Sequence, residues 1–497
     1  MSDGNGQAGK WPTTESPPGW AWAKFAQVFD NVTSSELKLK QKEYAEEGSL
    51  PVVDQGQELI GGYTNNDELQ HRSKLPVVLF GDHTQCVKYL DFQFVQGADG
   101  TKILKPSECV EPRFAYWSMR TIELPKKGYS RHFKFLRDSE FPIPPLAEQR
   151  RIVTAIESLQ ARSSRAREAL SEVGPLLEQF RQSVLRSAFS GRLTADWRAA
   201  HPDVEPASEL LARIRTERRQ RWEQAEQAKY KAKGKKPPKG WKEKYKKPSD
   251  RLTERRLTPL LESAPNTWTI ANLETIGELI TGKTPSTRNE SFWNGDIPFV
   301  TPSQVHPNGH ILPPKRTVTT EGAEQARIIH ANTILIVCIG TVGKAGLLDR
   351  TAIFNQQLNA IVACPQVEPR LLFFWCKLLR SWLIEEASAT VNSAIINKTR
   401  LGYAPFPLPP VDEQREMLRL IDAAFNGGEA IEQKSAESES ALTQLDQSIL
   451  AKAFRGELVP QDPNDEPASE LLARIRAANE SQPKNKTTNK RGKRNGD

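Results

Sequence analysis

The sequence predicts an α+β chain: two β-rich α+β domains separated by two long helices that form an antiparallel coiled coil, with a pseudo-two-fold internal repeat. One observation is that three segments occur twice: residues 141–150 (FPIPPLAEQR) return at 406–415 (FPLPPVDEQR), 182–193 at 447–458, and 205–215, letter for letter, at 466–476. The other is that each copy contains a long stretch of helical periodicity. A repeat of this length indicates two structurally equivalent units.

Each repeat begins with a proline-rich segment and continues as a predicted long helix. Pro142, Pro144 and Pro145 keep the chain extended ahead of the first helix, because proline disfavours helix in the residue before it. Apolar or small residues then follow at steps of four and three, the spacing of a coiled-coil seam. The seam positions are Ile152, Ile156, Leu159, Ser163, Ala166, Leu170, Val173, Leu177, Phe180 and Val184, and in the second copy Met417, Ile421, Ala424, Gly428, Ile431, Ser435, Ser438, Leu442, Leu445 and Ile449.

Two features are expected to weaken this seam. Gly174-Pro175 should kink the first helix, and the second seam is polar and small between Gly428 and Ser438. About 38 helical residues at about 1.5 Å each span roughly 60 Å, so the paired helices would form a spacer between the two domains. The alternative is that both helices are buried in a globular core.

The repeat and the composition divide the chain into seven regions. They are a disordered N-terminal tail (1–18), a first domain (19–142), a central helical region (143–218), a Lys-rich linker or insertion (219–262), a second domain (263–407), a distal helical region (408–480) and a basic disordered tail (481–497). Within the domains we expect helices at 22–29, 272–280 and 371–387, and strands at 87–95, 114–124, 327–339 and 353–363.

Composition limits the class of protein. The 497 residues carry a net charge of +8 and a pI near 9.1, which suggests an anionic partner. No apolar run approaches the roughly 20 residues of a membrane span, and the N-terminus lacks the apolar core of a signal peptide. The five cysteines show no paired spacing, which fits buried thiols in a reducing cytoplasm, and no zinc ligand set is visible.

The most biased segment is residues 229–247, which contain ten lysines and one acidic residue, Glu243. Tyr230, Trp241 and Tyr245 are interleaved with the lysines. One interpretation is a solvated linker. The other is a salt-sensitive, sequence-independent contact with nucleic-acid phosphates.

Residues Gly277–Thr284 formally match the phosphate-binding pattern G-x-x-x-x-G-K-[ST]. That loop requires a buried strand before it and a helix that starts at the lysine. Here Leu279 and Ile280 continue a helical pattern, and Pro285 disfavours helix at Thr284. We therefore expect 281–288 to be a polar loop that leaves a helix. Patterns of adenine methyltransferases, G-x-S-x-G hydrolases and nucleases are also missing, so the sequence favours a binding protein without catalysis of its own.

Several short motifs, in order along nearly the whole chain, resemble those of the specificity (S) subunit of type I restriction–modification enzymes. They are P-[IL]-P-P-x-x-E-Q at Pro142 and Pro407, A-F-x-G-x-L at Ala188 and Ala453, Gly282-Lys283-Thr284-Pro285 with Gly295-Asp296-Ile297-Pro298, and Ile339-Gly340-Thr341-Val342-Gly343-Lys344 followed by Asn355-Gln356-Gln357. The resemblance implies two target-recognition domains, each reading one half of a bipartite site in double-stranded DNA. It also implies that the helices are a spacer and a dock for two methyltransferase (modification) subunits, which two motor/endonuclease (restriction) subunits join. S-adenosylmethionine, Mg and ATP would belong to those partners, and this chain would bind no cofactor and no membrane.

Polar loop residues are the candidates for DNA contact. They are Gln55, Tyr63, Asp82, His83, Thr84 and Gln85 in the first domain, and Lys283, Thr284, Ser286, Arg288, Thr301, Ser303, Gln304, His306, Thr341 and Lys344 in the second. The candidates for subunit docking or for the spacer are Glu148, Gln149, Ile152, Ile156, Leu159, Phe189, Glu413, Gln414, Met417, Ile421 and Phe454. Two alternatives stay open: a nucleotide-dependent enzyme built on Gly277–Thr284, and a coiled-coil adaptor with no role at DNA.

Overall fold

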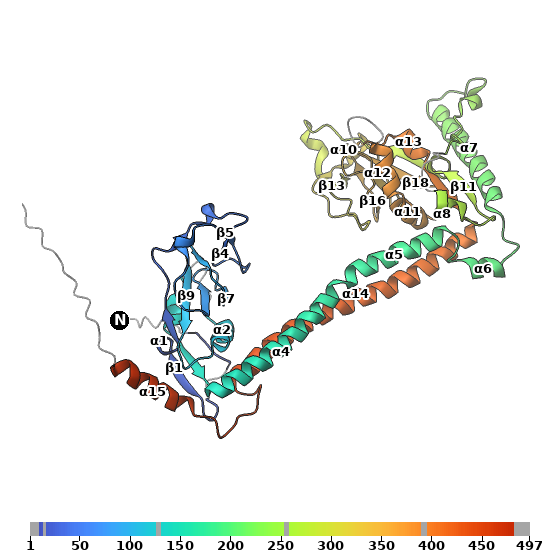
Figure 1. The fold of residues 1–497 in the computed structure, drawn as a ribbon. Coiled ribbons are helices and arrows are strands. Elements are labelled where there is room, and N and C mark those ends of the chain that lie inside the picture. The colour runs from blue at the N-terminus through green and yellow to red at the C-terminus, as the bar shows by residue number, and fades with distance from the viewer. Residues whose placement is uncertain (1–8, 13–15, 126–130, 253–257, 389–394, 482–497) are drawn as a thin grey trace, which may run out of the picture. The chain divides into compact units, whose positions relative to one another are not determined.

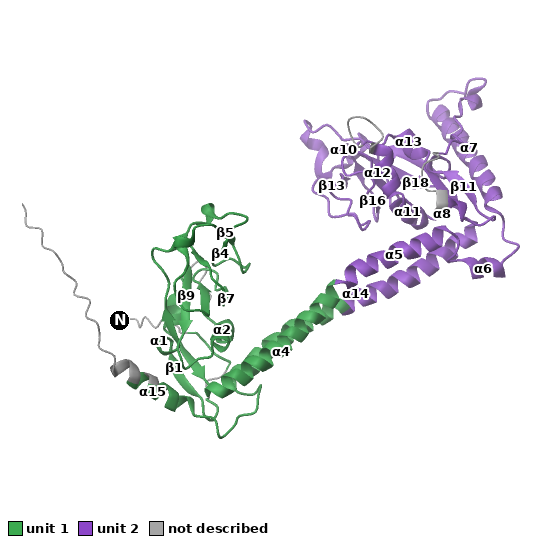
Figure 2. Cartoon of the chain, viewed as in Figure 1, with its two compact units in different colours: residues 1–171, 435–497 green, residues 172–434 purple. Residues whose placement is uncertain are grey.

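The computed structural model describes residues 9–12, 16–125, 131–252, 258–388 and 395–481. The chain forms two compact units (Figure 1, Figure 2). Unit 1 consists of residues 1–171 and 435–497, and unit 2 of residues 172–434. Each unit therefore combines one β-rich domain with parts of both long helical regions.

Unit 1 contains two four-stranded sheets, with strand orders β2-β9-β6-β7 and β3-β8-β4-β5. Its elements are β1 (Ala21–Lys24), α1 (Phe25–Val28), β2 (Phe29–Asn31), β3 (Lys38–Leu39), β4 (Leu50–Val53), β5 (Gly62–Thr64), β6 (Val77–Gly81), β7 (Val87–Leu90), β8 (Val95–Gly97), β9 (Thr101–Pro106), α2 (Pro112–Thr121), α3 (Phe133–Arg137), β10 (Glu140–Ile143), α4 (Leu146–Ser171) and α15 (Ala468–Ser481). The strand predicted at 114–124 is wrong, because these residues form α2. Pro112 at the first turn and the Glu111 carboxylate, which accepts the Phe114 N–H at 2.7 Å, start that helix despite its aromatic residues.

Unit 2 contains a four-stranded sheet, β12-β18-β15-β16, and a three-stranded sheet, β14-β13-β17. Its elements are α5 (Val173–Phe189), α6 (Ala195–Ala200), α7 (Ala207–Ala232), α8 (Thr258–Glu262), β11 (Thr269–Asn272), α9 (Leu273–Ile276), β12 (Gly277–Thr281), β13 (Trp293–Val300), β14 (Thr317–Val318), α10 (Thr320–Glu324), β15 (Ile334–Val337), β16 (Ala345–Leu347), β17 (Ile353–Phe354), β18 (Leu358–Ala363), α11 (Pro369–Leu378), α12 (Arg380–Ser388), α13 (Lys398–Gly402) and β19 (Pro405–Leu408). The helix predicted at 272–280 is wrong beyond Ile276. Gly277 begins β12 instead, and it packs so closely on β18 that a Cβ would lie 2.7 Å from the Ile361 side chain.

The helix predicted at 22–29 is likewise shorter than expected, since only α1 is helical and β1 and β2 flank it. The reason is a pairing that sequence periodicity does not show. β1 pairs antiparallel with β10 from Ala21↔Ile143 to Lys24↔Glu140, which holds the chain extended. The equivalent pair in unit 2 is β11 with β19, from Thr269↔Leu408 to Asn272↔Pro405. Both pairs end at the prolines that precede a long helix.

The long helices pair antiparallel within each unit, as predicted. In unit 1, Trp11 contacts both Phe141, before α4, and Phe454, at the end of α14 (Val411–Phe454), with ring centroids 5.5 Å apart in each case. Further along, Arg167 of α4 bridges to Asp446 at 2.8 Å. In unit 2, Phe189 at the end of α5 packs on Phe406, just before α14. The core of each unit thus contains the start of one long helix and the end of the other.

The predicted interruptions of the helices are visible. The first helix breaks at Glu172 into α4 and α5, because Pro175 has no N–H to donate to the Ser171 carbonyl. In unit 2, Gly428 lies against Leu177, but the seam positions Phe180 and Ile431 are 44% and 53% exposed. In unit 1, Leu445 is 49% exposed. The heptad assignment of these three positions is therefore wrong. The two helices bury few side chains against each other where the facing residues are small.

Two assignments along the chain also differ from expectation. Residues 9–12, expected in a disordered tail, pack on unit 1: the Trp11 indole donates to the Glu140 carbonyl at 2.7 Å, and Lys10 and Glu123 exchange backbone hydrogen bonds. Residues 219–232, expected in a linker, are the second half of α7. Most of the two predicted tails (1–8, 13–15 and 482–497) lies outside the described residues. Among the residues that are described, no helix is long and apolar enough to cross a membrane.

Candidate nucleic-acid interface

In unit 2, three loops meet at one end of the sheets, and the short segment 355–357 joins them. β17 runs parallel to β13, so the loop after Val300 begins beside 355–357, and the Asn355 N–H donates to the Val300 carbonyl at 3.1 Å. β12 and β15 both run antiparallel to β18, so their ends also lie beside the start of that strand. The three loops are 282–288, 301–306 and 338–344. All ten DNA-contact candidates of the second domain lie in them.

Loop 282–288 is held against residues 354–356. The Lys283 N–H donates to the Phe354 carbonyl at 2.9 Å, and the Thr284 hydroxyl donates to Gln356 Oε1 at 2.8 Å. Gly282 leaves no room for a side chain, since a Cβ there would overlap the Asn355 carbonyl oxygen. The side chains of Lys283, Ser286 and Arg288 are exposed. The backbone of the loop is therefore held in place, while these three side chains are exposed to solvent.

This geometry does not match a nucleotide-binding loop. The loop follows a strand, β12, rather than the helix that we predicted, but no helix starts at Lys283, and the Lys283 amide already donates to the Phe354 carbonyl. An amide that cradles a phosphate must be free of such a bond. The described residues also contain no group of three His, Cys, Asp or Glu side chains that could hold a metal ion.

The other candidates in unit 2 divide into shape-forming and exposed residues. Gln304 is buried, and its Oε1 accepts from the Thr301 N–H at 3.0 Å and the Thr301 hydroxyl at 2.6 Å, so both side chains close the turn. Ser303 and His306 are exposed beside that turn. Thr341 is exposed and Lys344 half-buried in a loop whose Gly340 and Gly343 have φ of +85° and +87°.

Unit 1 gathers loops in an equivalent way, with Gln55 at their centre. Gln55 Nε2 donates to the Asp99 carbonyl at 3.1 Å, its Oε1 accepts the His83 N–H at 3.2 Å, and its backbone carbonyl accepts the Thr84 hydroxyl at 2.8 Å. Asp82 is buried and accepts the Phe133 N–H at 2.8 Å, so it supports the loop. Gln85 is in the left-handed region at φ 56°, while Tyr63 is half-buried on β5 opposite Pro51.

Sequence reasoning missed several basic residues of unit 1. Lys38, Lys102 and Arg131 line, with Asp82 and His83, a pocket of about 230 Å³ next to these loops. These residues are far apart in the sequence, and only the tertiary fold brings them together. Lys88 is buried under loop 54–61, where its ammonium donates to the carbonyls of Glu58 and Leu59, and burial lowers its pKa. Neither feature leaves a local sequence signal.

The repeated Glu-Gln pair of the proline-rich motif joins each long helix to its own domain. The indole of Trp20 donates to Glu148 at 3.1 Å, and that of Trp268 donates to Glu413 at 2.8 Å. Gln149 accepts the Glu111 N–H at 2.7 Å and donates to the carbonyls of Cys109 and Pro144. Gln414 does the same with Glu368, Gln366 and Pro409. The two joints thus share the same tryptophan–glutamate and glutamine–backbone hydrogen bonds.

The carboxylates of these two joints differ in their surroundings. Burial raises the pKa of Glu148, whose neighbour Arg151 is paired with Asp465 at 2.7 Å. Glu413 additionally accepts the Thr194 hydroxyl at 2.7 Å and pairs with the Arg198 guanidinium. The predicted docking or spacer residues are otherwise interior: Gln149, Ile152, Ile156, Phe189, Gln414, Met417, Ile421 and Phe454 are buried and Leu159 is half-buried.

Comparison with known proteins finds similarity to one family. The family model for the type I restriction modification DNA specificity domain matches residues 265–439. The chain is 24% identical over 360 residues to the type I restriction enzyme EcoBI specificity subunit of Escherichia coli. The aligned residues cover 69% of this chain and 65% of that protein, so this chain spans just under two thirds of its relative's length. It is also 24% identical over 436 residues to the EcoDI specificity subunit of Escherichia coli, covering 81% and 84%.

A solved structure shares the fold. A chain from a study of complex assembly and conformational transition of the type I R-M system superposes with a TM-score of 0.56 at 18% identity, covering 90% of this chain and all of the other. Together with the duplicated loops and joints, these similarities confirm the resemblance and the fold class inferred from the sequence motifs. The chain is similar to specificity subunits of type I restriction–modification enzymes, and its residues 265–439 match the DNA specificity domain of that family.

Proposed function

We propose that this chain is the DNA sequence-recognition subunit of a type I restriction–modification complex, and that each unit reads one half of a bipartite duplex site. The observation that carries the proposal is the duplicated gathering of polar loops, at 355–357 in unit 2 and at Gln55 in unit 1. Exposed Lys, Arg, Ser, Thr and His side chains on a fixed loop backbone supply the hydrogen-bonding groups that read base edges. Neither alternative function gains support from the family comparison.

The buried candidates have a different part in this proposal. Asp82 and Gln304 are inaccessible and hold their loops in shape, so they affect recognition through loop geometry. Lys283, Ser286, Arg288 and His306 are exposed and contact bases or phosphates. Lys38, Lys102 and Arg131 add positive charge beside the loops of unit 1, where a phosphate can be neutralised.

The helices serve as spacer and dock in the proposed complex. The Glu-Gln joints fix each helix to its recognition domain, while Leu176, Phe180, Ile431 and Leu445 expose apolar surface on the helices. Large apolar side chains that are exposed together on one surface are typical of protein contacts. We propose that two methyltransferase subunits dock there and two motor/endonuclease subunits join them in the cytoplasm. Those partners bind S-adenosylmethionine, ATP and Mg, and this chain performs no catalysis.

Replacing Lys283 and Arg288 together by Ala tests whether each unit reads its half independently. The change is expected to weaken binding by about 1–3 kcal/mol for each base whose hydrogen bonds are removed, and to relax sequence preference in one half of the site only. Competition binding with single-base variants in both halves measures this. Arg327→Ala with Lys398→Ala, both exposed on unit 2 outside the loops, is the matched control and should leave preference unchanged. Equal relaxation of both halves would contradict the proposal.

A further inference from the structure

The lysine-rich segment 229–247, here called the lysine arm, is folded rather than a loose linker. After α7 the chain turns at Gly234, where φ is +62°, and returns along the helix. Trp241 stacks on Trp222 of α7 with ring centroids 5.9 Å apart and planes 27° apart, and Tyr245 lies 5.4 Å from the same indole. Lys242 pairs with Glu223 at 2.8 Å. The aromatic residues between the lysines therefore fasten the arm to its helix.

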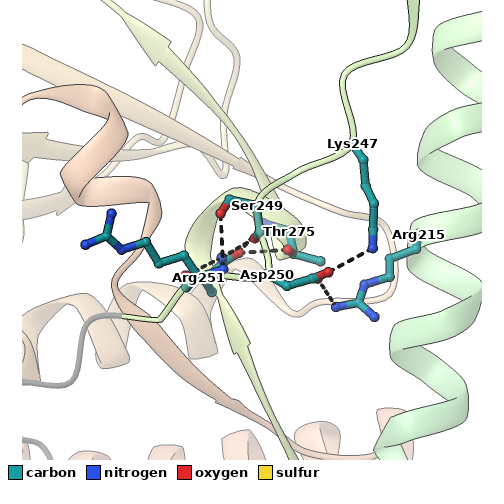
Figure 3. Close-up of polar contacts among 7 residues, drawn as sticks. Arg215, Lys247, Ser249, Asp250, Arg251 and Thr275 are labelled. Carbon is teal, nitrogen blue, oxygen red and sulfur yellow. Dashed lines mark hydrogen bonds and ion pairs between the residues drawn. The ribbon is translucent and has the colours of Figure 1, made fainter. Parts of the chain in front are cut away.

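The arm is also anchored where it rejoins the domain (Figure 3). Asp250 pairs with Arg215 of α7 at 2.6 Å and with Lys247 at 2.8 Å. The Asn272 side-chain amide, at the end of β11, donates to the carbonyls of Ser249 and Arg251 at 2.6 and 2.9 Å. Its oxygen accepts from the Thr275 N–H and hydroxyl. Two polar clasps, one to α7 and one to the sheet, thus fix the base of the arm to unit 2.

Most lysines of the arm are left for another partner. Lys229, Lys242 and Lys247 pair with Glu226, Glu223 and Asp250. In the part of the chain that the structure describes, seven further lysines are exposed and have no carboxylate within ion-pair distance: Lys231, Lys233, Lys235, Lys236, Lys239, Lys244 and Lys246. A flexible linker does not require the two aromatic contacts and the two polar clasps that hold the arm in place. A surface that presents several charges to a polyanion does require such a fixed position.

We propose that the lysine arm binds the phosphate backbone of duplex DNA next to the half-site that unit 2 reads. The inference deepens the proposed function and rests on it. Tyr245 and Lys246 border a groove with Glu278 of β12 and Val362 of β18, so the end of the arm that rejoins the domain lies beside the β12 edge of the sheet. The far end of β12 leads into recognition loop 282–288. Five residues of strand span about 17 Å, which is the length of about five base pairs of duplex DNA, so one duplex is long enough to contact both loop 282–288 and the nearby end of the arm.

A cluster of lysines suits contact with phosphates. Its ammonium is a compact point charge on a flexible stem, which neutralises phosphates without fixing a base-specific geometry. The arm therefore adds affinity that is independent of sequence and sensitive to salt. The contribution to the slope of log Kobs against log salt is about 0.9 for each phosphate neutralised.

The test uses the full chain in complex with its modification subunit and compares two seven-fold variants at the unpaired lysines. One variant carries Lys→Gln and the matched control carries Lys→Arg, which keeps the charge. Binding to duplexes with and without the split site is measured from low to moderate salt. For the Gln variant we expect the slope to fall by about three to six on both duplexes, while the ratio of affinities for the two duplexes is unchanged. The Arg variant should keep the wild-type slope.

A decrease of about two or more in the Gln variant, absent from the Arg variant, supports the inference. A smaller decrease, or an equal decrease in both variants, overturns it. Equal melting temperatures of the three proteins show that the fold is intact, as expected because the three paired lysines and both clasps are retained. A wild-type complex that prefers no split site would instead contradict the proposed function itself.

Discussion

Removing residues 164–170 from α4 together with 440–446 from α14 is expected to lower affinity for the original split site by at least about 100-fold. Seven helical residues are about 10 Å long, close to three base pairs of duplex. The paired deletion keeps the heptad register and removes Arg167 with its partner Asp446. If the helices set the separation of the two half-sites, the favoured gap must shorten by about three base pairs.

Recovery on the shorter site is expected to be partial. Three base pairs also rotate one half-site by about 100° around the duplex, since a turn contains 10–10.5 base pairs. Binding to a series of sites with gaps changed one base pair at a time measures the preference. Deleting 164–170 alone is the control: it leaves α14 partly unpaired and should lower stability rather than shift the gap. An unchanged gap preference after the paired deletion would contradict the spacer role.

Glu413→Ala is expected to lower the free energy of unfolding by about 3–5 kcal/mol. The change leaves the Arg198 charge and the hydrogen-bond donors of Trp268 and Thr194 without their buried acceptor. For a unit of this size that corresponds to a fall in Tm of roughly 6–20 °C. Glu413→Gln keeps an acceptor for Trp268 but loses the charge that pairs with Arg198, so it should fall in between. Thermal unfolding at neutral pH measures both. Wild-type stability of Glu413→Ala would show that this joint is dispensable.

Glu148→Gln at the equivalent joint is the matched control, with the opposite sign expected. Because burial raises the pKa of Glu148 above its ordinary 4.5, the folded protein holds this proton more tightly than the unfolded chain. The stability that the protonated Glu148 carboxyl contributes is therefore present below pH 4.5 and is lost as pH rises through the raised pKa. At neutral pH the variant should be the more stable protein, and below pH 4.5 the difference should vanish. Equal losses from Glu148→Gln and Glu413→Gln would refute this interpretation of the two environments.

Sequence reasoning succeeded where a single motif determines both the local structure and a long-range contact. The motif at 141–150 and 406–415 marks a proline-held strand, a helix start and a buried Glu-Gln joint at once, so the repeat predicted both units. That residues 282–288 and 301–306 form polar loops was also predictable, since turn residues and polar side chains occur there together; their contact with DNA stays a prediction.

What sequence reasoning missed depends on tertiary contacts. Lys38 lies on β3, Lys102 on β9 and Arg131 just before α3, so these three residues come together only in the folded domain. The spacing of apolar residues at 277–280 fits a helix, but pairing with β18 makes residues 277–281 a strand. In the lysine arm the interleaved aromatics were visible, but their partner Trp222 belongs to a helix that was not expected to extend so far.

The measurement that tests the central claim most directly is a methylation map. The chain would be co-expressed with the modification subunit of its own system, the complex purified, and the methylated positions in host DNA determined. We expect a stable complex and a single split motif, with adenine methylated in both halves and a gap of constant length. A continuous motif, or no complex and no motif, would contradict recognition by two units that each read one half.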